Sequence, residues 1–445
     1  MLLVEKHSIK NTTKNRELFN LIDDYCYKSK NLYNSTNYII TQCSRISYKL
    51  KQGEILDSWE KSLLYKVNCG IKAYNDSRPK KTPIKYIDEN NSNIADAYFL
   101  SWYLKDSYEY KNMPYSTCSQ IVIQNLCKNW KSFYQGIKAY KTNPSNMLGM
   151  PHKPNYLDKE KGRNAIIITN QVIKLLDNGT LKLPTFLKEI HIKPRHTDIS
   201  QIRIVTKNNK IDIQIMYKKE ETPINTLNTN RVMGIDIGVN NFATLTFNTS
   251  STPIIISGKY IKSVNQYYNK RKAELQEKAT ILNNQYTSKR MCRLTNRRNN
   301  KVEDYLHKAS SKIIELAIKD NIGTIVIGNN KGWKQESNMG KVTNQNFVSI
   351  PYYSFIKKLQ YKAELVGIKV LIVEEKYTSG TSYIDGEDPI KSNYNKSRRK
   401  HRGLFISNTG IRINADVNGS YQMMKKANYS IPYKGYEKVT VLKVA

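Results

Sequence analysis

The chain has 445 residues, which is enough for about three domains at the usual ~100–200 residues per domain. It carries 72 Lys and Arg against 37 Asp and Glu. The resulting net charge of +35 is far larger than solubility requires, and it attracts polyanions. We expect no membrane partner, because the sequence has neither an apolar run that would span a bilayer nor an amphipathic stretch suited to a membrane surface.

The first segment, residues 1–150, is expected to hold an N-terminal strand and a helical domain. Apolar residues recur at helical spacing between Leu18 and Ser29 and again between Ile121 and Ile137. Proline, glycine and charged residues then dominate from Asn143 to Arg163, which marks a boundary.

The second segment, residues 151–225, is predicted to be β-rich. Short alternating runs such as Ile202–Val205 and Ile211–Ile215 are typical of strands with one buried face. A linker rich in Thr and Asn follows at residues 221–230.

The third segment, residues 226–445, is predicted to be an α/β domain of the RNase H type. We expect a meander of three strands, one long charged helix over about residues 261–319, two more buried strands and a closing helix that begins near Asp416. The strands are predicted at Val232–Asp236, Phe242–Phe247, Pro253–Ile256, Thr324–Gly328 and Ile368–Val373.

Two apolar stretches of this segment each deliver an aspartate into a glycine-rich setting. Alternation along the first strand puts Met233, Ile235 and Ile237 on one face and Asp236 on the other, between two glycines. Small neighbours let a phosphate backbone and its metal ions approach a carboxylate closely. The second aspartate, Asp416, follows Asn414, which is suited to cap a helix there. Taken singly, each aspartate could simply cap a turn or a helix.

Together these motifs resemble the RuvC-type RNase H nucleases, specifically the transposon-encoded TnpB family and its relatives, the miniature type V CRISPR effectors. Four segments carry the resemblance, in the family's order: the GxPxxPxY turn at residues 149–156, the first nuclease motif at 234–245, the YTS segment at 374–382, and the third motif at 402–405 and 413–419. The resemblance implies a helical recognition domain at 1–150, a wedge domain at 151–225 and a RuvC-like nuclease at 226–445.

The family takes a third carboxylate from a V-x-E segment at the end of the fourth strand, and here that position is Gly328. The fifth strand ends directly in Glu374-Glu375, ahead of the YTS turn. By resemblance to rearranged members of the family, Glu375 is the substitute ligand and Glu374 the alternative; both could instead be surface acids at a strand end. Asp236, Glu375 and Asp416 would then be the catalytic residues and would hold two Mg²⁺ ions, for which Mn²⁺ can substitute.

A zinc ribbon of two CxxC pairs, present in many relatives, is absent, since the six cysteines form no such pair and the last is Cys292. We therefore expect no zinc. The thiols and the lack of a signal-peptide core indicate a reducing bacterial cytoplasm, in association with the nucleoid. In place of the ribbon, a basic loop over about residues 376–405 is expected to handle a nucleic-acid strand through Arg398, Arg399 and Arg402.

The middle of the long helix has a run of basic residues that is either a solvated face or a nucleic-acid contact. Beside a nuclease-like sheet we favour the contact. The residues concerned are Lys289, Arg290, Arg293, Arg297 and Arg298. The 32 tyrosines, many interleaved with Lys and Asn, suit base stacking, although most tyrosines fill helix interfaces.

The resemblance implies an RNA-guided DNA endonuclease that hydrolyses target DNA phosphodiesters with two metal ions. Its partners would be a guide RNA and a double-stranded DNA target with a short adjacent motif, bound as a monomer or as a homodimer on one guide RNA. The alternative is a guided DNA-binding repressor with an inactive nuclease, which Gly328 favours and Glu375 opposes.

Overall fold

In a computed structural model the chain is described at residues 1–147, 149–249, 251–283, 286–329, 345, 348–401, 403–429 and 439–444. It divides into two compact units, one of residues 2–219 and one of residues 220–445 with Met1. Both units contain helices and strands, which confirms the mixed α/β, multidomain class. The boundaries at 150 and 225 stay predictions. Among the described residues, none of the helices combines the length and apolar character that crossing a membrane requires.

The first unit contains a four-stranded antiparallel sheet in the order β1-β6-β5-β2, formed by β1 (Leu2–Lys10), β6 (Lys210–Lys218), β5 (Ile199–Lys207) and β2 (Ile166–Thr169). The N-terminal strand thus pairs with β6, some 200 residues away in sequence. Asn208 and Asn209, both at positive φ, make the tight turn between β5 and β6, because asparagine tolerates that conformation.

The helices of the first unit pack through apolar faces into one core with this sheet. They are α1 (Arg16–Lys51), α2 (Ser58–Asp76), α3 (Ala97–Tyr103), α4 (Tyr108–Lys111) and α5 (Ser116–Thr142). Smaller elements are β3 (Lys174–Leu175), β4 (Leu181–Lys182) and the 3-10 turns η1 (Pro144–Asn146), η2 (Asn170–Val172) and η3 (Thr185–Leu187).

The second unit is built on a six-stranded sheet in the order β11-β10-β7-β8-β9-β15. The strands β7, β8 and β9 form an antiparallel meander, and β10 and β11 continue the sheet parallel to β7. The five predicted strands are all present. Their bounds are β7 (Asn228–Ile237), β8 (Asn241–Phe247), β9 (Ile254–Ser257), β10 (Ile322–Gly328), β11 (Lys369–Val373) and the added edge strand β15 (Thr440–Leu442).

The two faces of this sheet bury different helices. Met233, Ile235 and Ile237 share a core with residues of α7 (Lys289–Lys319) and α9 (Tyr352–Leu365), as the alternation of β7 predicts. Val232 and Val326 face the other way and pack with α10 (Ala415–Lys426), which covers β7, β8 and β10. A small antiparallel sheet precedes α10, made of β12 (Arg399–His401), β13 (Leu404–Ile406) and β14 (Arg412–Ile413), with the 3-10 turns η4 (Lys391–Asn393) and η5 (Lys396–Arg398).

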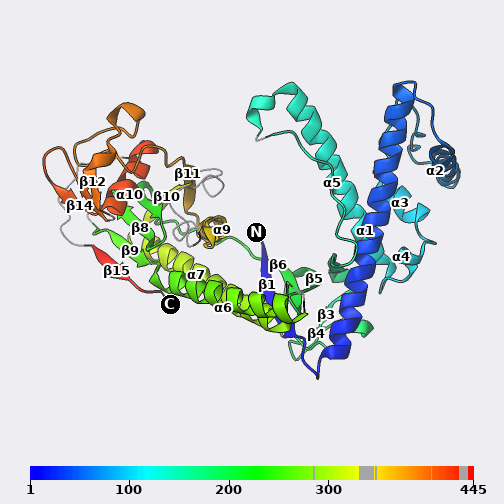
Figure 1. Cartoon of the computed structure of the whole chain (residues 1–445), viewed down its shortest axis with the longest axis horizontal. Helices are drawn as coiled ribbons and strands as arrows, with labels where there is room; N and C mark the ends of the chain where they lie inside the picture. The colour runs from blue at the N-terminus through cyan, green and yellow to red at the C-terminus, as the bar shows by residue number, and fades with distance from the viewer. Residues whose placement is uncertain are drawn as a thin grey trace. The chain divides into compact units, whose positions relative to one another are not determined.

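The prediction of a single long helix over residues 261–319 is wrong. The structure has two helices, α6 (Lys259–Asn283) and α7, which pack side by side along their length (Figure 1). They run antiparallel, since Tyr268 contacts Thr295 and Asn265 contacts Arg298. Helical periodicity continues on both sides of the break, whereas Ser288 begins a new helix by accepting a hydrogen bond from the Met291 amide at 3.2 Å.

Gly234 lets α10 lie directly against β7. A Cβ at this position would stand 2.6 Å from the Ser420 carbonyl oxygen and 2.9 Å from Thr246 Oγ1. The backbone of α10 cannot give way there without moving the whole helix.

We predict that Gly234→Ala lowers the free energy of unfolding by about 1–3 kcal/mol, the usual cost of overpacking. Chemical denaturation with a probe of the second unit measures the change. Gly149→Ala is the control, because nothing lies within 4 Å of a Cβ at Gly149. Equal stability of the two variants would contradict the close contact.

Candidate active site

Three carboxylates from distant parts of the second unit line one cavity of about 550 Å³. Asp236 lies near the end of β7, Glu375 lies two residues after β11, and Asp416 lies in the first turn of α10. Because β7, β10 and β11 are parallel, their carboxyl ends meet at one edge of the sheet. The structure therefore brings together the three residues that the sequence singled out.

Asp416 is held in place by the capped start of α10. The Asn414 side chain accepts hydrogen bonds from the amides of Asp416 at 3.0 Å and Val417 at 3.3 Å, as the sequence suggested. One turn later, a Cβ at Gly419 would lie 3.1 Å from Asp236 Oδ2. Because Gly419 has no side chain, the Asp236 carboxylate can lie directly against α10.

Gly328 leaves the space that Glu375 fills. A Cβ at Gly328 would stand 2.5 Å from Glu375 Cγ and 2.7 Å from Glu375 Oε1. The glutamate of the fifth strand therefore occupies the position above the end of the fourth strand. Its neighbour Glu374 is exposed and does not line the cavity. Of the two glutamates, the geometry favours Glu375.

The segment after Glu375 is fixed to α10 by buried hydrogen bonds. The Asn418 side chain donates to the Thr381 carbonyl oxygen at 2.8 Å and accepts from the Tyr383 amide at 2.9 Å. Thr378 Oγ1 donates to the carbonyl oxygen of Glu375 itself at 2.7 Å. The YTS segment therefore ties the end of β11 to the helix that carries Asp416.

The carboxylates repel one another in this confined place. Burial is the largest cause that raises the pKa of Asp236 well above its ordinary range, followed by the nearby charges of Glu375 and Asp416, while Arg399 opposes the shift. Burial raises the pKa of Glu375 to about 7. Such a group of acids favours either protons or a bound cation.

Two donors already contact Asp416. Arg399 donates from Nη2 to Oδ1 at 3.1 Å, and Asn241 donates from Nδ2 to Oδ2 at 2.7 Å. The role of Asn241 was missed from sequence, although it stands in the first nuclease motif. Its signal was its position at the start of β8, just after the tight turn that follows Asp236 and returns the chain to the same edge of the sheet.

The donor set suits a hard cation. Within the described residues, no three His, Cys, Asp or Glu side chains lie close enough to hold a metal ion as they stand. Carboxylate oxygens are nevertheless the ligands that Mg²⁺ prefers, and a cation would relieve the repulsion that raises the pKa of Asp236. Arg399 now supplies positive charge to Asp416. Asp236, Glu375 and Asp416 are therefore the residues that would hold metal.

The basic residues that were predicted to bind nucleic acid differ in their surroundings. Lys289, Arg290, Arg293 and Arg297 are exposed on α7. Arg298 is held by Asn265, and Arg398 forms an ion pair with Glu387 at 2.5 Å. Arg399 enters the carboxylate cavity, and Arg402 lies outside the described residues.

Two protein-family descriptions match parts of the chain, almost entirely within the second unit. Residues 214–334 match OrfB_IS605, described as a probable transposase, and residues 352–423 match the Cas12f1-like TNB domain. The second match runs through the YTS segment and the third motif. The chain is related to the TnpB proteins and the miniature type V effectors.

Individual relatives agree with this relationship. The TnpB-like protein ORF457 of Acidianus two-tailed virus is 23% identical over 404 residues, which are 83% of this chain and 84% of that protein. The CRISPR-associated endodeoxyribonuclease Cas12f1 of Sulfoacidibacillus thermotolerans is 25% identical over 230 residues, 50% of this chain and 51% of that protein, so the match spans about half of the Cas12f1 length.

Among solved structures, a Cas12f1–sgRNA–target DNA complex aligns over 97% of this chain and 99% of that one, at 14% identity and a TM-score of 0.35. A TM-score this low does not establish a shared arrangement of the whole chain.

We predict that Mg²⁺ stabilises this TnpB-related chain more at pH 8 than at pH 6. Because the pKa of Glu375 is raised to about 7 and that of Asp236 is also raised, protons bind at the site as the pH falls, with Glu375 taking its proton near pH 7, and these protons compete with metal. Without metal, the same shifts make the folded state bind more protons than the unfolded one, so stability should rise as the pH falls from about 7 towards the ordinary range of a carboxyl group.

Thermal unfolding with and without Mg²⁺ measures both effects. Saturation at about 100 times the Kd is worth about 2.7 kcal/mol. Asp236→Asn should abolish the metal effect, and Glu374→Gln, an exposed neighbour, should retain it. Equal stabilisation of both variants by Mg²⁺ would contradict the site.

Proposed function

We propose that this chain is an RNA-guided DNA endonuclease that hydrolyses the phosphodiesters of its target at a two-metal site. The observation that carries the proposal is the convergence of Asp236, Glu375 and Asp416 in one cavity, with Glu375 over Gly328. The relationship to TnpB proteins and to a Cas12f1 that is an endodeoxyribonuclease supports the class of reaction.

The arrangement of the second unit agrees with an RNase H-like nuclease of the RuvC type. Three antiparallel strands are followed by two parallel ones, with acids at the shared carboxyl edge and on the first turn of a covering helix, as the resemblance to that family implies. The missing acid of the fourth strand is compensated within the same cavity. This favours an active nuclease over the alternative, a guided repressor with an inactive site.

The carboxylates of the cavity would act together. Asp236, Glu375 and Asp416, which line the same cavity, would supply the ligands for the cations. Mg²⁺ held by these carboxylates would supply activation of a water and neutralisation of the charge on the leaving oxygen. Arg399, which forms an ion pair with Asp416 and lines the same cavity, would be in place to bind a phosphate oxygen of the strand being cut.

The choice of target would belong to a guide RNA. A net charge of +35 suits a chain that holds an RNA and an RNA–DNA heteroduplex through their backbones, while base pairing determines the sequence. The protein itself would recognise a short motif beside the target in double-stranded DNA. It would work as a monomer or as a homodimer on one guide RNA.

We predict that Asp236→Ala and Asp416→Ala bind target DNA but do not cut it, and that EDTA abolishes cutting by the wild type. Glu375→Gln, which removes charge but little volume, should lower the cleavage rate by about 10²-fold or more. Gly328→Ala should also slow cleavage, because its Cβ pushes Glu375 aside. Single-turnover cleavage of labelled DNA measures each rate.

Glu374→Gln is the matched control and should stay close to the wild type. Full cleavage by either aspartate variant would contradict the assignment. If the Glu374 and Glu375 variants exchange their effects, Glu374 is the ligand. If DNA is bound with guide but never cut by the wild type, the protein is the repressor.

We predict that the purified protein retains one discrete RNA through a high-salt wash. Nonspecific binding to a chain of this charge falls steeply with salt, whereas recognition of a folded RNA adds shape, stacking and 2′-hydroxyl contacts. Replacing the variable end of that RNA should redirect cutting to the new complementary DNA. Heterogeneous RNA that washes away, with unchanged DNA cutting, would leave an unguided nuclease.

A further inference from the structure

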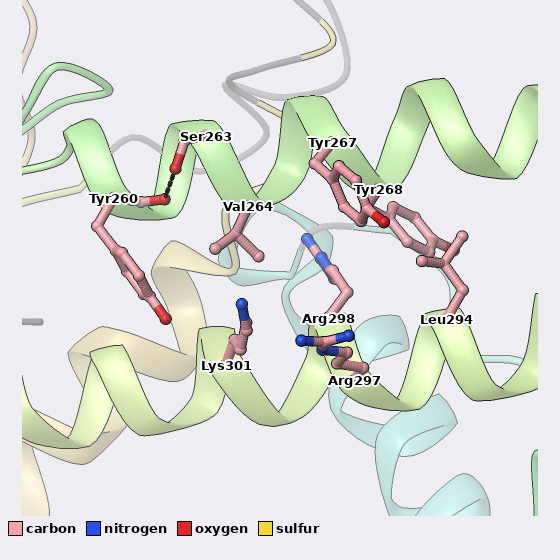
Figure 2. A pocket seen from close by; sticks show the side chains of 9 residues that line it. All are labelled: Tyr260, Ser263, Val264, Tyr267, Tyr268, Leu294, Arg297, Arg298 and Lys301. Atoms are coloured by element: carbon pink, nitrogen blue, oxygen red, sulfur yellow. Dashed lines mark hydrogen bonds between the residues drawn. The ribbon is translucent and has the colours of Figure 1, made fainter.

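A second cavity, of about 380 Å³, lies between α6 and α7. It shares no lining residue with the carboxylate cavity. Tyrosine side chains of α6 and basic side chains of α7 point toward one another across it (Figure 2). Its volume lies in the range of small-ligand sites.

One wall of this interhelical pocket is aromatic. Tyr267 leaves 61% of its surface exposed, which is unusual for a ring that only packs two helices together. Tyr268 is fixed by a hydrogen bond between its hydroxyl and Thr295 Oγ1 at 3.2 Å. The ring of Tyr260 stacks at 25° on Tyr305, with the two centroids 6.1 Å apart. The wall therefore offers accessible ring surface on a fixed support.

The opposite wall is cationic, and one of its arginines is part of the scaffold. Arg298 donates from Nε to Asn265 Oδ1 at 2.7 Å and from Nη2 to the Ser349 carbonyl oxygen, and its guanidinium lies 5.6 Å from the Tyr268 ring centroid. Arg297 and Lys301 are exposed and form no ion pair with any residue that the structure describes. None of the described residues that line the pocket is acidic.

A ligand that satisfies both walls has a planar ring and an adjacent anion. An acidic peptide would pair with the cations but leave the exposed ring of Tyr267 without a stacking partner. A nucleotide supplies both groups, and base–aromatic stacking tolerates every base.

We propose that the interhelical pocket binds one unpaired nucleotide of a nucleic-acid strand, with its base against Tyr267 and its phosphate at Arg297 and Lys301. The inference rests on the proposed function, since it gives α6 and α7 a binding role in the same nuclease. The shared ligand chemistry is a single-stranded nucleotide, and the strand that supplies it is either RNA or DNA.

Photo-cross-linking locates the contact. The full chain is irradiated with single-stranded RNA that carries 5-bromouridine, or with single-stranded DNA that carries 5-bromodeoxyuridine, and the linked peptides are identified by mass spectrometry. We expect the links to concentrate on the α6 peptide that contains Tyr267. The arm that links more efficiently identifies the strand.

Affinity measurements separate stacking from charge. Tyr267→Ala should weaken binding of these oligonucleotides by about 5- to 150-fold, Tyr267→Phe should retain it, and the salt dependence should not change. Arg297→Gln with Lys301→Gln should instead make binding less dependent on salt. Tyr286→Ala is the matched control, because Tyr286 is 71% exposed near the start of α7 but lies outside the pocket.

Equal affinity of Tyr267→Ala and Tyr286→Ala, with links spread over many tyrosines, would overturn the inference. That result leaves guided cleavage by the wild type intact, so it does not touch the proposed function. Conversely, a chain that never cuts DNA but links through Tyr267 would retain the pocket and lose the nuclease. Far-ultraviolet circular dichroism of each variant verifies folding, which the exposure of Tyr267 predicts to be unaffected.

Discussion

The candidate site depends on how closely one helix can approach one strand. At Gly234 a Cβ would meet the backbone of α10, and at Gly419 a Cβ would meet the carboxylate of Asp236. Two residues without side chains, one on each element, allow this contact, and the Thr246–Ser420 hydroxyl pair at 2.8 Å fixes its register. Because Asp416 is carried on the same helix, the distance between the two aspartates follows from backbone packing. The YTS segment then adds Glu375 through its bonds to Asn418.

The second constraint is electrostatic. The fold buries acidic groups close together: burial raises the pKa of both Asp236 and Glu375, and repulsion by Glu375 and Asp416 raises that of Asp236 further. Arg399 opposes the shift at Asp236, and Arg399 and Asn241 both donate hydrogen bonds to Asp416. A site of this kind is less stable empty than filled, so binding of cations and stability of the nuclease unit are linked.

The sequence predicted the parts of this molecule that depend on local pattern. The alternation of Met233 with Asp236, the cap at Asn414 and the five strands of the second unit follow from periodicity and helix-start chemistry, and the structure agrees. The break between α6 and α7 was missed, because helical spacing is present on both sides of it. Contacts such as Asn241 to Asp416 join residues 175 positions apart, and no local pattern encodes them. The interhelical pocket was likewise not predicted, because it requires two separate helices, α6 and α7, packed against each other.

The relation between Gly328 and Glu375 bears on how such a site could arise. The two positions share one volume, so a glutamate on each would collide, and a small residue on one is the condition for a glutamate on the other. If the catalytic glutamate shifted from the fourth strand to the fifth during evolution, an intermediate with glutamates at both positions would have been crowded. The other route would pass through an ancestor with a glutamate at neither position, which would bind its target without cutting it. On that second route, guided DNA-binding proteins without nuclease activity would be expected intermediates.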